Sequence, residues 1–374
     1  MFTSLQTVLF YDIIFLVCFI FFNKYEQTKR DFYKIFPYVI IFFISVTRFD
    51  IGADYEGQYF TINEMIKSQN LLSFSRFVDD TARTQGLSIV VFLFRSFPHA
   101  FLWINGFYFT IFICSIYYLL NNYNAHKWGI LALFLSLLLF QSWDWIKQSA
   151  AVGFAACSVL NTDKNNYKKS ALFLMAAILF HLSALFVIPI LLFKKIKYIS
   201  SKILAFILIG VFVTAEMGMF KSIYQQLLVI TPFYSDVYSN STFYAEMNSY
   251  TYLSTSYIFF SLWSIIIMYF SPERTKVFNL MFFIGVVIYM VSGGSLLMDR
   301  ISIYYTMSQL VLLPAIMSEK NKPIKRYYLI VLILANIALI NRRCFEYGDL
   351  RGCTPYETIF SSEFEGMKFR YRGY

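Results

Sequence analysis

The sequence predicts an all-α, polytopic integral membrane protein. Its 374 residues are 58% hydrophobic and only 14% charged, a balance that a soluble globular domain does not show. Apolar runs of about 20 residues, the length that crosses a bilayer as a helix, recur from one end of the chain to the other. We therefore expect one membrane domain over 1–374 with about ten to twelve transmembrane helices, including a re-entrant pair.

The distribution of lysine and arginine predicts the orientation of the chain. The first apolar run, LQTVLFYDIIFLVCFIFF, lacks the features of a cleavable signal, so it is expected to remain as the first span. The basic loop at 23–34 then lies in the cytoplasm, because short cytoplasmic loops are rich in lysine and arginine. It follows that 48–85, 221–252 and the tail 341–374 are extracytoplasmic. Further spans are expected in WGILALFLSLLLF (128–140) and VFNLMFFIGVVIYMVSGGSLLM (277–298).

The run at 170–193 lies between two lysine-rich loops and is interrupted only by His181. If both flanking loops are cytoplasmic, the run must enter the membrane and return as two half-length helices, with His181 near the turn. The alternative is a single tilted helix in which His181 is a core residue. Both interpretations stay open at the level of sequence.

Ionisable residues gather on the predicted outer face, with His181 approaching from the hairpin: Arg48, Asp54, Lys147, Asp299 and Arg300. Such groups at membrane depth are costly unless they are paired or solvated, so they indicate function. Guanidinium groups suit phosphate oxygens, which favours a lipid diphosphate as ligand. The alternatives are that Arg48 and Lys147 snorkel at helix ends, and that Asp299 only neutralises Arg300.

Aromatic residues accompany the charges of the first outer segment. Phe49, Tyr55, Tyr59 and Phe60 offer flat faces of the kind that bind sugars. We expect no metal and no cofactor, because the three histidines are scattered and no metal-ligand spacing occurs. The basic residues lie in short loops and at helix ends, a pattern typical of contacts with membrane lipids and not with nucleic acid.

Five segments together resemble one family. They are RFDIGADY with Arg48, Gly52, Asp54 and Tyr55; WIKQSAAVGFA with Lys147 and Gln148; FHLSALFVIP with His181; DRISIYY with Asp299, Arg300, Tyr304 and Tyr305; and TPYETIF with Tyr356. In this order they are similar to the EpsG/Wzy type of polysaccharide polymerase. Lys147 stands where that family commonly has arginine, so it keeps the charge but loses the bidentate fork.

The resemblance implies an enzyme with a GT-C-like helical bundle that joins oligosaccharide repeat units, carried on undecaprenyl diphosphate, into O-antigen or capsular polysaccharide. The reaction is expected at the periplasmic face of a bacterial inner membrane, with a flippase and a chain-length regulator as partners. The implied catalytic residues are Arg48, Asp54, His181 and Arg300. Substrate binding is expected from Gly52, Tyr55, Lys147, Gln148, Asp299, Tyr304, Tyr305 and Tyr356.

Two other functions share parts of this chemistry. An O-antigen ligase or another lipid-dependent glycosyltransferase differs only in its acceptor, whereas a flippase is expected to line a cavity across both leaflets and to show repeat symmetry. In the tail, Cys344 and Cys353 enclose eight residues. They either form a disulfide in an oxidising compartment or remain two free thiols.

Overall fold

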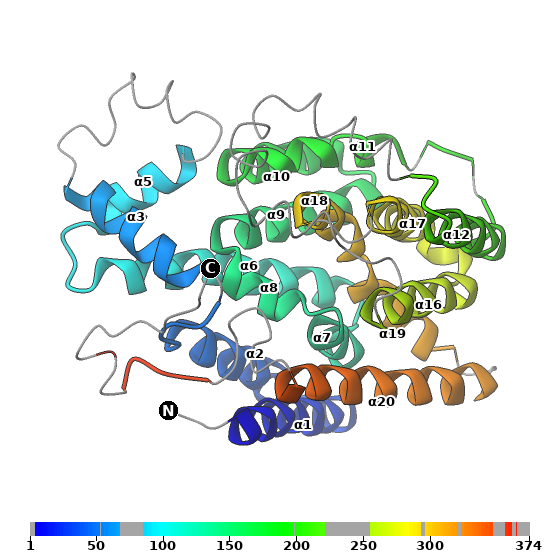
Figure 1. The fold of residues 1–374 in the computed structure, drawn as a ribbon, viewed down its shortest axis with the longest axis horizontal. Coiled ribbons are helices and arrows are strands. Elements are labelled where there is room, and N and C mark those ends of the chain that lie inside the picture. The colour runs from blue at the N-terminus through cyan, green and yellow to red at the C-terminus, as the bar shows by residue number, and fades with distance from the viewer. Residues whose placement is uncertain are drawn as a thin grey trace. The chain divides into compact units, whose positions relative to one another are not determined.

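Helices make up every regular element of the described chain. The computed structural model describes residues 4–52, 54–67, 85–193, 195–197, 199–220, 255–292, 296–319, 323–346, 356–360 and 364. Within these ranges the chain is helical and forms no strand, and an isolated antiparallel bridge joins Arg48 to Thr358 (Figure 1). The prediction of an all-α, polytopic membrane protein is confirmed.

The helices follow one another along the chain with these bounds: α1 Ser4–Thr28, α2 Asp31–Val46, α3 Tyr55–Lys67, α5 Gln85–Phe94, α6 Ala100–Asn122, α7 His126–Leu135, α8 Leu138–Asp144, α9 Ile146–Asp163, α10 Tyr167–Phe180, η1 Leu182–Val187, α11 Ile190–Phe193, α12 Ser201–Glu216, α16 Thr255–Phe270, η2 Glu273–Thr275, α17 Lys276–Val291, α18 Leu296–Thr306, α19 Gln309–Met317 and α20 Pro323–Glu346. Contacts divide the chain into a first unit, 1–188 with 326–371, and a second unit, 189–325 with 372–374. The expectation of a single membrane domain stays a prediction.

Helix α1 shows how the apolar runs meet the lipid. One side of the helix packs inside the first unit through buried residues such as Tyr11, Ile14 and Cys18. The other side carries apolar residues three or four positions apart that are about half exposed: Leu5, Leu9, Ile13, Leu16 and Ile20. Water disfavours a stripe of this kind, whereas lipid accommodates it. By length and composition α1, α6 and the segment Glu273–Val291 are able to cross a membrane.

Two of the predicted spans are each divided between two helices in the structure. The run 128–140 is divided between α7 and α8, because Leu137 adopts a left-handed conformation with φ +59°. The run 277–298 is divided between α17, which ends at Val291, and α18, which begins at Leu296. Hydropathy reports the length of an apolar run but carries no information on a reversal of the backbone within it.

The segment 48–85, predicted as an outer loop, contains a helix. Helix α3 begins directly after the R-x-x-x-G-x-D-Y signature and lies beside α5 (Figure 1). Helix α5 covers most of the short apolar run GLSIVVFLFRSF at 86–97. The predicted loop 221–252 and most of the tail 347–374 lie outside the described residues, whereas α20 continues into the predicted tail as far as Glu346.

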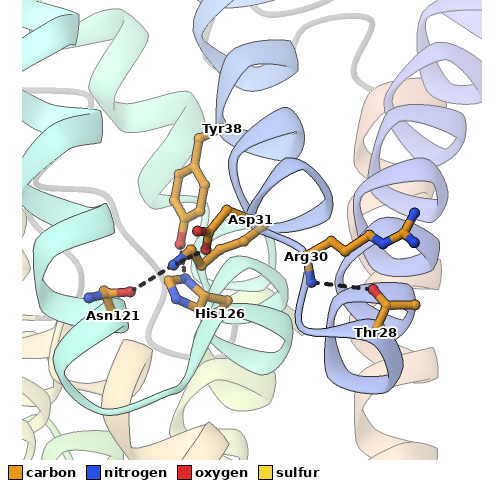
Figure 2. Close-up of polar contacts among 7 residues, drawn as sticks. Thr28, Arg30, Asp31, Tyr38, Asn121 and His126 are labelled. Atoms are coloured by element: carbon orange, nitrogen blue, oxygen red, sulfur yellow. Dashed lines mark hydrogen bonds and ion pairs between the residues drawn. The ribbon is translucent and has the colours of Figure 1, made fainter.

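A polar cluster joins α2, α6 and α7 at one end of the first unit. The Tyr38 hydroxyl lies 2.7 Å from Nδ1 of His126, the first residue of α7. Both side chains are drawn in Figure 2. Lys34 forms an ion pair with Asp31 at 2.9 Å and donates to Oδ1 of Asn121 at 3.5 Å. The same end carries the basic turn between α1 and α2, which was predicted to be cytoplasmic. The opposite end of α2 leads to the candidate site.

The second unit is built on close helix contacts. Helices α17 and α18 pack so closely at Gly285 that a Cβ added there would lie 2.7 Å from Cβ of Tyr305. The Arg274 guanidinium, in η2, donates to the carbonyl of Ala315 in α19 at 3.1 Å. Ser201, at the start of α12, donates to the carbonyl of Ser271 at 2.7 Å.

Candidate active site

The signature segment is the connection between α2 and α3. Helix α2 ends at Val46. Two residues of the connection that follows have a positive φ, Asp50 at +50° and Gly52 at +108°. The Tyr55 amide donates to the Gly52 carbonyl at 3.1 Å and starts α3. Residues 48–55 therefore form a compact double turn and not an open loop.

Gly52 occupies a position where no side chain fits. A Cβ at this residue would lie 2.9 Å from the carbonyl oxygen of Trp143 and 3.2 Å from Cα of Asp144. The positive φ excludes most other residues independently. The glycine of the signature thus allows the double turn to lie directly against the end of α8.

Asp144 joins this end of α8 to α3. Its Oδ1 accepts a hydrogen bond from the Asp54 amide at 2.8 Å, and its carbonyl accepts one from Nε2 of Gln58 at 2.6 Å. Asp144 is only 4% exposed, whereas the Asp54 side chain is exposed. Asp144 therefore fixes the backbone from which the Asp54 carboxylate reaches outward. Sequence reasoning missed Asp144 and Gln58; the available signal was an acid three residues before Lys147.

Arg48 lies inside this arrangement. It is 2% exposed, its Nη2 donates to the Trp143 carbonyl at 3.1 Å, and its Nη1 donates to the Ser45 carbonyl. The indole nitrogen of Trp143 donates to the Ser45 hydroxyl at 2.7 Å. The guanidinium thus connects the end of α2 to the end of α8, which gives Arg48 a positioning role.

The segment 356–359 is also hydrogen-bonded to the double turn and to the residue before it. The Phe49 amide donates to the carbonyl of Glu357 at 3.0 Å, and the Ile359 amide donates to the carbonyl of Thr47 at 2.9 Å. The hydroxyl of the buried Tyr356 donates to the carbonyl of Ile44 at 2.6 Å. Burial raises the pKa of Tyr356 to about 12. Tyr356, expected to bind substrate, anchors the tail on α2.

Aromatic residues of the signature line a cleft beside the double turn. The cleft has a volume of about 290 Å³, and its lining includes Phe49, Tyr55 and Tyr59. Phe60 is absent from the lining and is 52% exposed. The Tyr55 hydroxyl points the other way and donates to the carbonyl of Arg48 at 3.5 Å. Three of the four aromatics expected to offer sugar-binding faces therefore lie together.

Lys147 and Gln148 begin α9, directly after the residues that contact the double turn. Lys147 is partly exposed and Gln148 is buried.

The predicted break at His181 is present: α10 ends at Phe180, His181 is extended with φ −155°, and η1 follows. Nδ1 of His181 lies 2.6 Å from the hydroxyl of Ser183, which is close enough for a hydrogen bond. Whether the two flanks return to one membrane face stays a prediction.

The remaining expected site residues belong to the second unit. Arg300, Tyr304 and Tyr305 lie on α18; both tyrosines are buried and Arg300 is partly exposed. The side chain of Asp299 lies outside the described residues, as do the side chains of Cys344 and Cys353, so the proposed disulfide stays a prediction. The participation of Arg300 in a site with Arg48 is likewise a prediction.

The described part of the first unit brings acid–base chemistry together with aromatic surface. Asp54 supplies an exposed carboxylate, and its backbone amide is bound to Asp144. Lys147, three residues after Asp144, supplies a positive charge on the first turn of α9. Among the described residues, no group of three or more His, Cys, Asp and Glu side chains is arranged to bind a metal ion. The site is suited to proton transfer and to binding an oxygen-rich substrate.

A sequence model of the EpsG family matches residues 31–358, which is most of the chain. The chain belongs to the EpsG family. The matched range contains the double turn, the end of α8 with the start of α9, His181 and Tyr356. Neither the curated proteins nor the solved structures contain a significant match. EpsG membership, together with the apolar helices, indicates a membrane protein with a polysaccharide polymerase role.

Proposed function

We propose that this EpsG-family protein polymerises oligosaccharide repeat units carried on undecaprenyl diphosphate, at the periplasmic face of a bacterial inner membrane. The observation that carries the proposal is the contact of one segment that resembles a polymerase motif, RFDIGADY, with the two residues that directly precede another such segment, WIKQSAAVGFA. Gly52 lies against Trp143, and the Asp54 amide is bound to Asp144 at 2.8 Å. This contact leaves the Asp54 carboxylate exposed.

The reaction is a glycosyl transfer with a diphosphate leaving group. A hydroxyl oxygen at the non-reducing end of one repeat unit forms a bond to the anomeric carbon of the growing chain. The bond from that carbon to the diphosphate oxygen breaks, and the oxygen takes the electron pair. The hydroxyl proton passes to a general base, for which the exposed Asp54 carboxylate is the first candidate and His181 the second.

The departing diphosphate develops negative charge, which cations stabilise. Lys147 and Arg300 are the candidates for direct contact, and Arg48 maintains the geometry from its buried position. A single displacement inverts the anomeric centre, whereas a carboxylate that acts as nucleophile leads to retention. O-antigen and capsular polysaccharide are both products of this chemistry.

The glycan ladder of a deletion strain tests the proposal. Deletion of the gene should leave single repeat units attached to the final acceptor, and the plasmid-borne wild type should restore long chains. Long polymer that accumulates on the lipid carrier would instead identify a ligase. Loss of all periplasmic repeat units would identify a flippase. Purified protein incubated with lipid-linked repeat units should release undecaprenyl diphosphate as the chains grow.

A further inference from the structure

The cleft beside the double turn carries an inference about substrate recognition. We propose that this cleft is a saccharide-binding subsite in which sugar rings stack on Tyr59 while Asn63, Arg95 and His99 bind their hydroxyl or carboxylate oxygens. The inference rests on the proposed function and deepens it, because it assigns residues outside the signature to the repeat unit. The volume of about 290 Å³ is near the lower end, about 300 Å³, of small-molecule sites, which suits the end of a sugar chain.

The aromatic wall of the cleft is fixed by its own packing. The ring of buried Phe101 meets the rings of Tyr55 and Tyr59 edge-on, at centroid distances of 5.1 and 5.3 Å. Tyr55 also meets Phe49 edge-on at 6.0 Å. Edge-to-face contacts of this kind fix the planes of the rings. A wall of preset rings binds a sugar face with little loss of side-chain freedom.

The turn between α5 and α6 also lines the cleft, and it carries polar groups. Arg95 follows α5 and is exposed, with its guanidinium 4.6 Å from the ring centroid of Phe92. His99 precedes α6 in a left-handed conformation, with φ +53°. A non-glycine residue in this conformation is uncommon and indicates a local constraint. Trp103 stabilises the turn, because its indole nitrogen donates to the Pro98 carbonyl at 3.2 Å.

Three polar side chains belong to the described lining of the cleft: Asn63, Arg95 and His99. Within the described part of the chain, the side chains of Asn63, Arg95 and His99 form no hydrogen bond with protein groups. The described lining contains the positive charge of Arg95 and no carboxylate. Hydroxyl-rich and acidic sugars both match this combination of donors and flat rings, whereas a lipid chain would leave the donors unsatisfied.

The cleft is placed next to the proposed chemistry by two shared residues. Phe49 and Tyr55 line the cleft and also belong to the double turn that carries Asp54. Because Asp54 directly precedes Tyr55, a sugar in the cleft lies beside the segment that carries the exposed Asp54 carboxylate. His181 lies elsewhere: the end of α10 contacts the N-terminal end of α5, at Gly86, while Arg95 follows its C-terminal end.

Binding of a soluble probe tests the subsite. The probe is a single repeat-unit oligosaccharide, free of diphosphate and lipid, prepared from the polysaccharide of the host strain. Full-length protein in lipid nanodiscs should bind this probe in saturation-transfer NMR. Tyr59→Ala and Arg95→Gln should weaken binding roughly tenfold each, while Tyr59→Phe retains it. Tyr327→Ala and Arg30→Gln are matched controls, because Tyr327 and Arg30 are exposed and lie outside the cleft lining.

The chain length of the polymer made in cells tests the subsite and the proposed function separately. Tyr59→Ala and Arg95→Gln should shorten the chains, with thermal unfolding of the purified protein unchanged for Arg95→Gln. Wild-type protein that binds no probe, or variants that bind it as tightly as wild type, would overturn the subsite even though polymerisation is intact. Normal polymer in the deletion strain would overturn the proposed function itself.

Discussion

Gly52 shows how one residue without a side chain sets the geometry of the site. Its left-handed conformation turns the chain after Asp50, and its missing Cβ leaves room for the Trp143 carbonyl. The sequence identified Gly52 as part of a signature, but the reason for it depends on a residue 91 positions away. Only the fold brings the two together.

Gly52→Ala should therefore destabilise the protein and abolish long chains. The left-handed backbone alone costs alanine about 1–2 kcal/mol, and the close approach to the Trp143 carbonyl adds to this. Gly57→Ala is the matched control, because Gly57 lies within α3 with no atom within 4 Å of the added Cβ. This control should gain about 0.5–1 kcal/mol. Thermal unfolding in detergent and the glycan ladder measure both effects; equal behaviour of the two variants would contradict the role assigned to Gly52.

At the scale of elements, the segment 356–359 acts as a strap across the double turn. It pairs with Thr47 and Phe49 through backbone hydrogen bonds and buries Tyr356 against α1 and α2. The sequence predicted that Tyr356 belongs with the site. It did not predict the anchoring contact, because hydrogen bonds between segments some 300 residues apart leave no periodic pattern.

Removal of the strap should disrupt the site. A chain that ends at Pro355 loses the contacts of Tyr356, and the loss of one buried aromatic side chain costs about 3–5 kcal/mol. A chain that ends at Phe364 keeps the strap and serves as the control. Tyr356→Phe keeps the ring but removes the hydroxyl that donates to the Ile44 carbonyl, which should cost about 1 kcal/mol. Normal stability and normal polymer from the chain that ends at Pro355 would show that the strap has no such role.

For the whole molecule, composition was sufficient to predict an all-α membrane protein, because the lipid imposes helices on apolar runs. The same reasoning did not indicate that the runs 128–140 and 277–298 are each divided between two helices. It also missed Asp144, which becomes important because α8, beginning after the left-handed residue Leu137, ends against the double turn. Local composition determines elements, whereas the site depends on contacts between distant elements.

Orientation in the membrane is tested by labelling from one side. Lys168→Cys and Lys197→Cys, each in a background without the five native cysteines, place thiols at exposed positions on either side of the break at His181. If 170–193 enters the membrane and returns, both thiols react only with reagents that reach the cytoplasm. Reaction from opposite sides would show that the segment crosses the membrane and would contradict the predicted hairpin.

The central claim is that the Asp54 carboxylate, on a backbone fixed by Asp144, carries the proton transfer of chain growth. The most direct test is polymer formation by purified Asp54→Asn protein, with Glu56→Gln, two residues further on in the first turn of α3, as its matched control. Asp54 is exposed and its backbone contact is kept, so both variants should unfold at the wild-type temperature. The account predicts that Asp54→Asn slows chain growth by about 10²-fold or more, while Glu56→Gln stays near wild type. Chain growth at the wild-type rate by Asp54→Asn would contradict it.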